Sequence, residues 1–498
     1  MYDLVIMGGG INGVGIARDA AGRGLKVLLC EKDDIAQHTS SASTKLIHGG
    51  LRYLEQYEFS LVRKALLERE VLLNIAPHII WPLRFVLPHA PHLRPAWMIR
   101  AGMFLYDNLA LRKKLPKSRF VNLQKHVAGQ FIKSEFRKGF EYSDAFVYDA
   151  RLSILNAMDA QERGADIRVQ TRVVSATPNR GAWDVVIEPN GEGQQIIQAK
   201  VIVNASGPWV SNVLTDALKI ASKNVVRHVK GSHIVVPAMF DHKFAYIFQN
   251  EDKRVIFAIP FERGFTLVGT TDIEYEDRLD QVKISDDEEA YLCDAVSRYF
   301  NTPVCPQDIV SSFAGVRPLL DDDSGNPSAV TRDYSLELSH CEQSSVISVF
   351  GGKITTYRVL AEEVLDKLSE LMPIEKNAWT HNAALPGGDF SDGDFLSFEA
   401  KQQKLYHWLP TELISRYARL YGTRMNVFLS GKVCIADMGE LISLDLYSAE
   451  VNYLMSNEWA RTADDVLFRR SKLGLIASKE DVGRLVAYMD NARKVMIH

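Results

Sequence analysis

The sequence predicts a mixed α/β protein, in which a parallel sheet is joined to an antiparallel sheet and to a C-terminal helical domain. Three observations support this prediction. A strand, a glycine turn, a helix and a second strand open the chain; strand-like segments alternate with loops over about 225–300; and the chain beyond about 385 is mostly helical and charged. A chain of 498 residues is also too long for a single core, so several domains are expected.

The first element is a βαβ unit, which predicts a parallel sheet. A strand over Leu4–Met7 leads through the turn Gly8–Gly10 into a helix over Asn12–Arg23, and a second strand covers Lys26–Cys30.

The turn of this unit carries a dinucleotide fingerprint. Gly8, Gly10 and Gly13 form G-x-G-x-x-G, in which the glycines permit a tight turn, close approach of the backbone to a pyrophosphate, and close packing of helix on strand. Glu31 follows the second strand, where its carboxylate can accept from a ribose hydroxyl. Strand, turn, helix, strand and acid all agree, so the unit predicts a dinucleotide site.

The later elements are expected from periodicity and from breaking residues. Apolar spacing predicts a helix over Phe59–Asn74, and the prolines and histidines of 77–95 predict irregular or edge structure. Residues 141–167 read as a helix that ends at Gly164, and a single strand follows over 167–178. Three further expectations are a hairpin over 182–209 that feeds a buried strand at Val201–Val203, a strand, glycine turn and helix over 345–371, and a linker around 385–395.

The segment after Glu31 favours FAD over a nicotinamide dinucleotide. A nicotinamide enzyme is expected to continue with further βαβ units, whereas this chain passes directly into the hydroxyl-rich stretch "TSSASTKLIHGGLRYLE". Two later glycine turns, "NASGPW" and "FGGKITTYR", can bring more backbone amides to a long cofactor lying across several strand ends. Together these turns favour FAD.

Composition excludes several classes of protein. The net charge of −4 gives no overall attraction to nucleic acid, so no such partner is expected. The five cysteines are scattered and form no CxxC pair, which favours a reducing compartment, with the cytoplasm as the default, and predicts no metal site. There is no basic region of a signal peptide, and no apolar run reaches the length of about 18 residues that a spanning helix needs.

At this point the chain resembles the FAD-dependent glycerol-3-phosphate dehydrogenase family, specifically its bacterial aerobic, respiratory members. The motifs that carry the resemblance are "GGGINGVGIARDAAGRGLKVLLCEKDD", "TSSASTKLIHGGLRYLE", "VNASGPW", "KGSHIVVP", "LVGTTDIEY", "AGVRPLLDDD", "TRDYSLE" and "VFGGKITTYR", in family order. The resemblance implies a fold of the D-amino-acid-oxidase type and oxidation of sn-glycerol 3-phosphate to dihydroxyacetone phosphate, with electrons passed from reduced flavin to a membrane quinone.

The resemblance also implies a discontinuous arrangement of domains. The expected segments of the FAD-binding domain are 1–75, 141–224 and 311–384. A substrate or membrane-facing segment is expected over 76–140, a substrate domain over 225–310 and a C-terminal helical domain over 385–498.

The cofactor is expected to contact the glycine turns and the hydroxyl-rich stretch. The residues assigned to FAD are Gly8, Gly10, Asn12, Gly13, Glu31, Thr39, Ser40, Ser41, Thr44, Lys45, Leu46, His48, Gly49, Val173, Ala205, Ser206, Gly207, Trp209, Gly315, Gly352, Lys353, Ile354 and Thr355.

A phosphorylated substrate needs cations, and arginine suits a phosphate because its fork donates in bidentate geometry and stays charged. Arg52, Arg317, Arg332 and Lys353 lie in motif-bearing loops and are the candidates, with Tyr53 as a further donor. Some of these cations could instead be solvated or pair with the acidic run at 321–323.

Removing a proton from the substrate hydroxyl needs a base that titrates near neutral pH. His233 is the candidate base, and His48 is expected to line the site by contacting flavin or orienting substrate; together with Arg317 they form the predicted catalytic set. The alternative for both histidines is a purely local hydrogen bond.

Residues 94–117 combine apolar side chains with cations, which suits an anionic membrane surface, where each nearby cation contributes about 1 kcal/mol. The apolar set is Trp97, Met98, Met103, Phe104 and Leu105, and the cations are Arg94, Arg100, Arg112, Lys113, Lys114 and Lys117. With the family resemblance this favours monotopic association at the cytoplasmic face of the inner membrane, with a soluble pool also possible. The alternative is a helix buried against its own domain or a second subunit.

Three expectations are left with alternatives. The chain is expected to form a homodimer, although the sequence does not settle the oligomeric state. Another flavin oxidase of the same fold, acting on an amine or a hydroxy acid with oxygen as acceptor, is the closest alternative function. A non-catalytic flavin redox switch is the remote one, and the basic segment near Arg112 would supply its partner surface.

Overall fold

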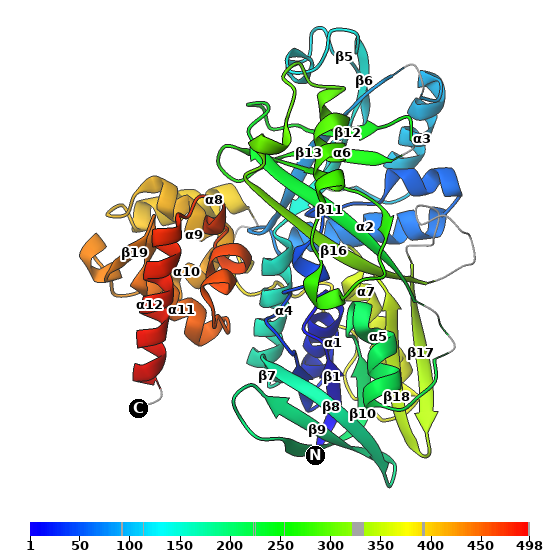
Figure 1. Cartoon of the computed structure of the whole chain (residues 1–498), viewed down its shortest axis with the longest axis vertical. Helices are drawn as coiled ribbons and strands as arrows, with labels where there is room; N and C mark the ends of the chain where they lie inside the picture. Colours follow the sequence, from blue (N-terminus) through cyan, green and yellow to red (C-terminus); the bar gives the residue numbers. More distant parts are fainter. Residues whose placement is uncertain are drawn as a thin grey trace.

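The computed structural model describes residues 1–90, 93–112, 114–222, 224, 226–252, 254–320, 333–390 and 394–496. Figure 1 shows two sheets, one below the other in the view, with the C-terminal helices beside them on the left. The mixed α/β fold class predicted from the sequence is confirmed.

The first sheet is the dinucleotide-type sheet predicted from the βαβ unit. Its strand order is β17-β18-β10-β1-β2-β7, and β1 pairs in parallel with β2 on one side and β10 on the other. The strands of this order are β1 (Tyr2–Met7), β2 (Val27–Cys30), β7 (Asp166–Arg168), β10 (Gln195–Asn204), β17 (Tyr334–Cys341) and β18 (Ser344–Gly351). The edge strand β17 runs antiparallel to β18.

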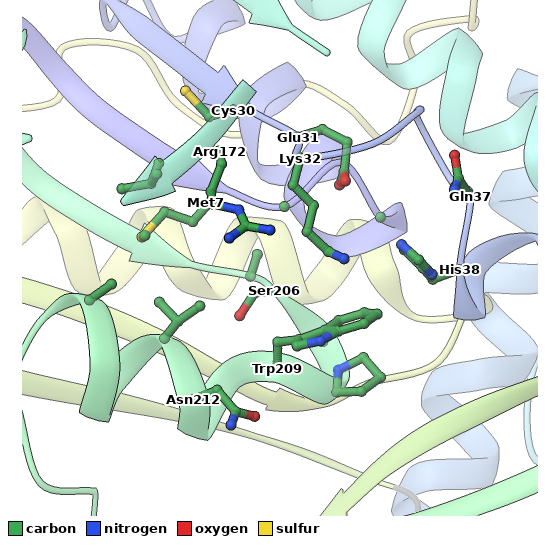
Figure 2. A pocket seen from close by; sticks show the side chains of 18 of the residues that line it. Met7, Cys30, Glu31, Lys32, Gln37, His38, Arg172, Ser206, Trp209 and Asn212 are labelled. Atoms are coloured by element: carbon green, nitrogen blue, oxygen red, sulfur yellow. The ribbon is translucent and has the colours of Figure 1, made fainter. Parts of the chain in front are cut away.

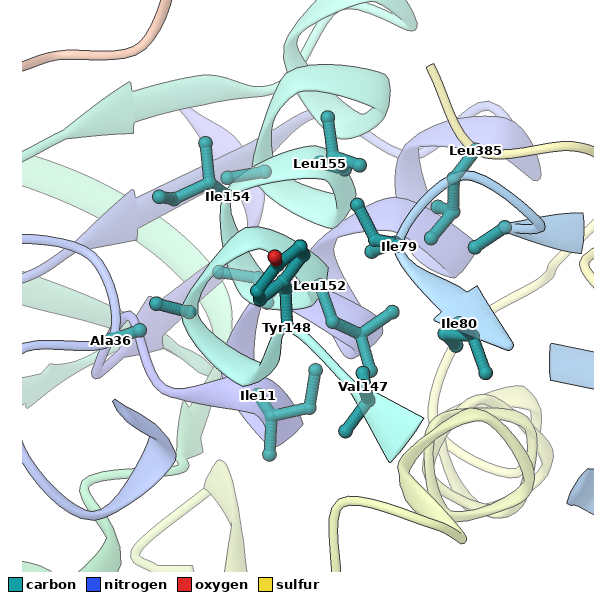
Figure 3. Packing of buried hydrophobic residues seen from close by; sticks show 14 of the residues in the cluster. Ile11, Ala36, Ile79, Ile80, Val147, Tyr148, Leu152, Ile154, Leu155 and Leu385 are labelled. Atoms are coloured by element: carbon teal, nitrogen blue, oxygen red, sulfur yellow. The ribbon is translucent and has the colours of Figure 1, made fainter. Parts of the chain in front are cut away.

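Both faces of this sheet are buried. Successive side chains of a strand point to opposite faces, so alternate residues of β1 pack in two different apolar clusters. Leu4 and Ile6 of β1 pack with the apolar residues of three helices, α1 (Ile11–Gly22), α4 (Asp149–Glu162) and α7 (Tyr357–Ser369). Figure 3 shows other members of the same cluster, around Leu152 and Leu155 of α4. Val5 and Met7 face the opposite cluster, which is built from β8 (Thr171–Asn179), β9 (Ala182–Pro189), α5 (Val210–Asn212) and the π-helix η5 (Val213–Ala217).

The second sheet has ten strands and is mostly antiparallel. Its order is β15-β11-β14-β13-β12-β4-β6-β3, with β16 paired to β11 and β5 paired to β6. The helix α6 (Asp286–Ser297) packs on this sheet, and a capping box between Ser285 and Glu288 fixes its start. The strands are β3 (Leu46–Ile47), β4 (Ile80–Pro88), β5 (Arg119–Asn122), β6 (Lys138–Val147), β11 (Val226–Pro237), β12 (Ala245–Gln249), β13 (Val255–Phe261), β14 (Phe265–Gly269), β15 (Ile273–Glu274) and β16 (Ser311–Leu320). Strand pairing thus brings β6 and β16, which lie outside the expected 225–310 segment, into the same sheet.

Three local predictions were wrong. The proline-rich stretch 77–95 contains β4, an interior strand that pairs with β6 along Ile80–Pro88 and with β12 at Phe85 and Val86. Pro82 is tolerated because it lies outside the short pairing with β12. The stretch read as the start of a helix at 141 is β6, which is buried along almost its whole length and so lacks a strand-like alternation of exposed residues. The single strand expected over 167–178 is β7 and β8, separated at Gln170, whose φ is 50°.

Two helices lie between the segments of the sheets, α2 (Phe59–Ile75) and α3 (Ala96–Asn108). The C-terminal domain contains α8 (Phe395–Leu405), α9 (Thr411–Tyr421), α10 (Met425–Leu429), α11 (Ser448–Asn457), the π-helix η10 (Asp465–Arg470) and α12 (Lys479–Met496), with a small hairpin of β19 (Leu441–Ser443) and β20 (Leu446–Tyr447). A fully buried ion pair between Arg151 of α4 and Glu458 ties this domain to the first sheet's helices.

Candidate active site

Two cavities meet at the carboxyl end of the first sheet. One, of about 540 Å³, lies beside Glu31 and is drawn in Figure 2; the other, of about 320 Å³, lies between the first sheet and the second. They share the lining residues Gly10, Thr39, Ser40, Ala205, Gly207 and Pro208. The cavities therefore form one long groove across several strand ends, where open α/β sheets bind their ligands.

At the glycine turn in the centre of the groove, two parts of the backbone lie too close together to leave room for a side chain. A Cβ atom on Gly13 would lie 1.9 Å from the carbonyl oxygen of Gly8, and Gly8 itself has a φ of 109°. Only glycine can meet both conditions, because a non-glycine residue strains at such a φ and a Cβ needs more room. The turn thus presents backbone at the start of α1, where helix amide groups attract an anion.

Glu31 is held in place by backbone amides. Its carboxylate accepts from the Gly9 amide at 2.6 Å and from the Asp33 amide at 2.8 Å. Burial raises the pKa of Glu31 above its ordinary value, while these two amide donors lower it. Glu31 lines the first cavity, in the position expected of an acid that accepts from a ribose hydroxyl.

Most of the residues assigned to the cofactor line the groove. Glu31, Val173, Ser206 and Trp209 line the first cavity, as do Gly8, Gly10, Thr39, Ser40, Ala205 and Gly207. The second cavity is lined by Asn12, Thr44, Leu46, His48, Gly315, Gly352, Lys353, Ile354 and Thr355. Neither set of lining residues includes Gly13, Ser41, Lys45 or Gly49.

The hydroxyl-rich stretch is held by the protein itself. Thr39 Oγ1 donates to the carbonyl of Val316 at 2.7 Å, and Ser40 Oγ accepts from the amide of Ile11 at 2.9 Å. Lys45 is buried in an ion pair with Asp149 at 2.9 Å, away from the groove. These side chains therefore shape the wall that connects the two sheets, a role that the sequence did not indicate.

Arg317 is fixed at the wall of the second cavity. Its Nη1 lies 2.5 Å from Asp272 Oδ1, and its Nη2 donates to Thr270 Oγ1 at 3.0 Å. Its observed carboxylate partner is Asp272, whereas the acidic run 321–323, proposed as a partner, lies outside the described residues.

The other predicted substrate residues are described to different extents. Lys353 Nζ lies 3.9 Å from the centre of the Tyr53 ring, a cation–π contact at the cavity wall. Arg52 lies in the short helix η2 (Leu51–Gln56), but its side chain is outside the described part of the structure, and so is the whole of Arg332.

The two predicted histidines occupy different environments. His48 lines the second cavity. His233 is fully buried, stacks on Phe313 with ring centres 4.9 Å apart, and lies 2.9 Å from Thr44 Oγ1 through Nε2. The pKa of His233 lies well below its ordinary value because burial disfavours the charged ring, and Arg317 and Lys45 add positive charge nearby.

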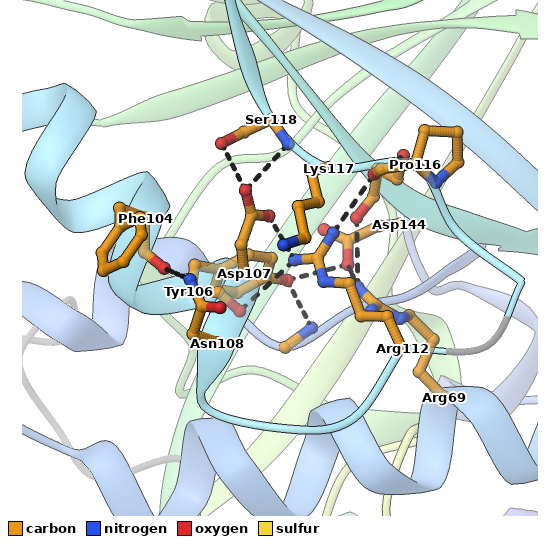
Figure 4. Close-up of polar contacts among 12 residues, drawn as sticks. Arg69, Phe104, Tyr106, Asp107, Asn108, Arg112, Pro116, Lys117, Ser118 and Asp144 are labelled. Atoms are coloured by element: carbon orange, nitrogen blue, oxygen red, sulfur yellow. Dashed lines mark hydrogen bonds and ion pairs between the residues drawn. The ribbon is translucent and has the colours of Figure 1, made fainter.

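A buried polar network supports the segment that carries His48. Figure 4 shows Tyr106 with Asp144 and Arg69 in this network. The Tyr106 hydroxyl accepts from the Gly49 amide at 2.9 Å and donates to Asp144 at 2.7 Å, and Arg69 donates to the same carboxylate at 2.6 Å. These hydrogen bonds fix the backbone next to His48.

Sequence reasoning missed several residues of the second cavity. Asp272 and Asp144 supply its carboxylates, and an apolar wall comes from Phe85, Tyr142, Ile247, Val255 and Phe257. Asp272 directly follows "VGTT" in a stretch already singled out, so an acid at the end of that strand was a usable signal. The apolar wall had no signal, because buried apolar residues of a strand look alike whether they face a core or a cavity.

The groove fits a long dinucleotide cofactor such as FAD. Asn12 Oδ1 is buried at the second cavity without a hydrogen-bond partner among the described residues, so a ligand hydroxyl or imide could donate to it. A Cβ atom on Gly352 would lie 2.7 Å from Asn12 Nδ2, so glycine keeps this part of the groove open.

Comparison with known proteins agrees with this geometry. The chain matches the FAD dependent oxidoreductase family over residues 3–358 and the C-terminal domain of alpha-glycerophosphate oxidase over residues 378–495. It is 53% identical to the glycerol-3-phosphate dehydrogenase of Pseudomonas aeruginosa, covering 99% of this chain and 95% of that protein. It is 50% identical to the D-erythritol 1-phosphate dehydrogenase of Brucella abortus, covering 99% and 98%.

A solved structure extends the similarity to the whole fold. The glycerol-3-phosphate dehydrogenase of Bacillus halodurans complexed with FAD is 26% identical, with a TM-score of 0.77, covering 99% of this chain and 94% of that one.

The glycine turn yields a first prediction. We expect Gly13→Ala to lose bound flavin or to fail to fold, because the added methyl group would collide with the Gly8 carbonyl. Gly483→Ala in α12 is the control: nothing lies within 4 Å of its Cβ, so the change should be neutral or stabilise the helix by up to about 1 kcal/mol. The flavin content, as flavin absorbance per amount of protein, and the thermal midpoint are measured for both variants. Full flavin content in Gly13→Ala would contradict this role of the turn.

Proposed function

The chain belongs to the FAD-dependent oxidoreductase family, within its glycerol-3-phosphate dehydrogenases, and we propose that it oxidises sn-glycerol 3-phosphate to dihydroxyacetone phosphate and passes the electrons to a membrane quinone. The observation that carries the substrate is the 53% identity to a glycerol-3-phosphate dehydrogenase along nearly the whole chain. Basic residues at the wall of the second cavity are consistent with an anionic substrate.

Oxidation of a secondary alcohol removes a hydride from carbon and a proton from oxygen. FAD, when bound, supplies the acceptor for the hydride. The residues of the chain must then hold the phosphate, orient the alcohol and take up the proton.

We assign Arg317 and Lys353 to binding the substrate phosphate, and Arg52 and Arg332 are further candidates from the sequence. Asp272 and Thr270 fix the plane of the Arg317 guanidinium, so it meets a phosphate in one orientation. Lys353 is held over the ring of Tyr53, which is itself assigned as a donor to the substrate. Charge-assisted hydrogen bonds of this kind are about twice as strong as neutral ones.

We assign His233 as the base that takes up the proton, which reaches it through Thr44. Thr44 Oγ1 lines the cavity and lies 2.9 Å from His233 Nε2, so the substrate hydroxyl would give its proton to Thr44 while Thr44 gives its own to the ring. This requires the tautomer in which Nδ1 carries the hydrogen. The lowered pKa keeps the ring neutral and able to accept at physiological pH. His48, which lines the cavity directly, is assigned to orienting the substrate and is the alternative base.

D-Erythritol 1-phosphate is a second candidate substrate. The chain is 50% identical to a D-erythritol 1-phosphate dehydrogenase over nearly its full length, a value close to that for the glycerol-3-phosphate relative. Both compounds are phosphorylated polyols with a secondary alcohol, so the same cations and the same base serve either one. The length of the carbon chain is what distinguishes them.

Association with an anionic membrane surface, on the cytoplasmic side, is proposed for α3. Trp97 and Phe104 on this helix are 70% and 63% exposed, while Met103 is buried. The basic face is smaller than expected, because Arg112 turns inward to pair with Asp107 at 2.7 Å, as Figure 4 shows, and Lys113 lies outside the described residues. Within the described residues, no helix has both the length and the apolar character needed to cross a bilayer.

The substrate proposal predicts which compounds reduce the flavin. In anaerobic stopped-flow spectroscopy, sn-glycerol 3-phosphate or D-erythritol 1-phosphate should bleach the flavin band rapidly, and glycerol or a 2-hydroxy acid should not. Arg317→Met should raise the substrate concentration for half-maximal rate about tenfold to a hundredfold, because a charged hydrogen bond contributes about 1.5–3 kcal/mol. Arg254→Met, a change at a surface arginine beside Asp252, is the control.

Bleaching by neither polyol phosphate would contradict the substrate class. Rapid oxygen consumption without added quinone would contradict the proposed acceptor and favour an oxidase.

The base assignment predicts a flat pH profile. His233 is already neutral well below pH 6.5, so the rate of flavin reduction should not fall as the pH drops from about 8 to about 6. His233→Asn should slow reduction at every pH in this range, because Thr44 then has no base to receive its proton. A loss of about tenfold per pH unit below about 6.5 in the natural protein would instead indicate a base with an ordinary histidine pKa and contradict His233.

The membrane proposal predicts a specific loss of vesicle binding. The double variant Trp97→Ser and Phe104→Ser should float with vesicles of phosphatidylglycerol and phosphatidylcholine far less than the natural protein. Leu396→Ser with Val433→Ser removes two apolar residues of similar exposure from the C-terminal domain, and this variant should float normally. Equal binding by all three proteins would contradict a role for α3.

A further inference from the structure

We propose that the C-terminal domain sets the affinity for FAD, because Arg469 and Arg470 hold the loop of the first cavity in place through Asp34. In this role the two arginines are positioning residues that do not touch the cofactor themselves. The inference rests on FAD occupying the groove and is independent of which substrate the enzyme oxidises.

The loop in question, residues 31–38, forms one side of the first cavity. Glu31, Lys32, Gln37 and His38 all line that cavity, and Figure 2 shows their side chains along one side of it. The position of each depends on the backbone of this one short loop. Whatever fixes the loop therefore fixes four groups that face the cofactor.

Asp34 is the point where the C-terminal domain grips the loop. Arg469 Nε lies 2.6 Å from Asp34 Oδ2, and Arg470 reaches both oxygens of the same carboxylate, with Nη2 at 2.8 Å from Oδ1. Asp34 is 6% exposed and Arg470 is fully buried. A bidentate buried pair of this kind is directional as well as charged.

The two consecutive arginines that reach one carboxylate lie at the end of a π-helix. In an α-helix successive side chains diverge by about 100°, so neighbours seldom meet the same partner. Arg469 and Arg470 end the π-helix η10, whose wider turn is rare in proteins and frequent at functional sites. The local helix geometry is thus suited to this contact.

Contacts within the C-terminal domain, and a further contact with α4, hold Arg469 and Arg470 in place. Arg469 also pairs with Asp465, and Arg470 Nη2 donates to the carbonyl of Glu458 at 2.5 Å. The carboxylate of Glu458 is in turn paired with Arg151 of α4. These contacts hold both arginines in place independently of Asp34, so the arginines give the loop a rigid support.

Apolar packing and a backbone hydrogen bond hold the inner side of the loop. Ile35 is buried, and its Cδ1 would lie 2.8 Å from a Cβ atom on Gly9, while the Ala36 amide donates to the Gly9 carbonyl at 3.1 Å. The outer side faces a polar cavity of about 370 Å³ between the loop and the C-terminal domain, lined by Asp33, Asp34, Arg461, Asp465 and Arg469 among others. The contacts on that side are polar: they are the ion pairs at Asp34 and the Gln170 amide, which donates to the Asp33 carbonyl at 2.9 Å.

Neutralising Asp34 should therefore release the loop. Asp34→Asn keeps the shape of the side chain but leaves two arginines around an amide, and breaking a buried pair by removing one partner is strongly unfavourable. FAD would then have to order the loop as it binds, which weakens binding. Because Arg469 is partly exposed, Arg469→Gln offers a milder change that does not depend on the fully buried Arg470.

The experiment measures FAD affinity in the full-length protein. FAD is removed and titrated back while its fluorescence is followed, and the thermal midpoint of the apoprotein is recorded for each variant. We expect Asp34→Asn to raise the dissociation constant of FAD about tenfold or more and Arg469→Gln to raise it by less, with both variants releasing FAD faster on dilution. Restoring charge with Arg469→Lys should recover part of the affinity.

Arg424→Gln is the matched control. Arg424 also joins the C-terminal domain to α4, through Glu162, but lies away from the loop. This variant should keep the affinity of the natural protein for FAD.

Two results would overturn the proposal. If Asp34→Asn and Arg469→Gln lower the apoprotein midpoint but bind FAD with the natural affinity, the contact is only structural. If Arg424→Gln weakens FAD binding as much as they do, the effect belongs to domain docking in general and not to this loop. Neither result depends on substrate turnover, so failure here is distinguishable from failure of the proposed reaction.

Discussion

The close approach of Gly13 to the Gly8 carbonyl is the constraint on which the rest of the structure depends. Because Gly13 has no Cβ, α1 can begin directly at the end of β1, and backbone atoms form the floor of the groove. The central position of β1, paired with β2 and β10, then places the turn in the middle of the sheet edge. Every other wall of the groove is arranged around this point.

Those walls come from segments that are far apart in the chain. The stretch after Glu31 leads from the first sheet to the second, and Thr39 ties it to β16 while Ser40 ties it to the start of α1. The carboxyl ends of β10 and β18 supply two further turns. The groove therefore lies between two sheets that several segments of the chain join, and Arg317 of the second sheet lies at the wall of the second cavity.

Buried charges hold these segments in register. Lys45 with Asp149, Arg151 with Glu458, and Arg470 with Asp34 each join elements that are remote in sequence. Such pairs add little net stability compared with apolar packing, but leaving one partner alone is strongly unfavourable. They therefore favour one arrangement of the domains over others, and the pair at Asp34 extends that control to the cofactor loop.

The sequence by itself determined the glycine turn, the acid at Glu31, the fold class and the family, because these depend on local backbone needs and on the order of motifs. It could not give the interior position of β4, since proline and a buried strand both hide the alternation that marks a strand. Only the tertiary structure decided that Lys45 and Arg112 turn inward, that His233 reaches the cavity through Thr44, and that Asp34 meets Arg470. The partner of a charged side chain is set by which distant segment packs against it, and no local pattern records that contact.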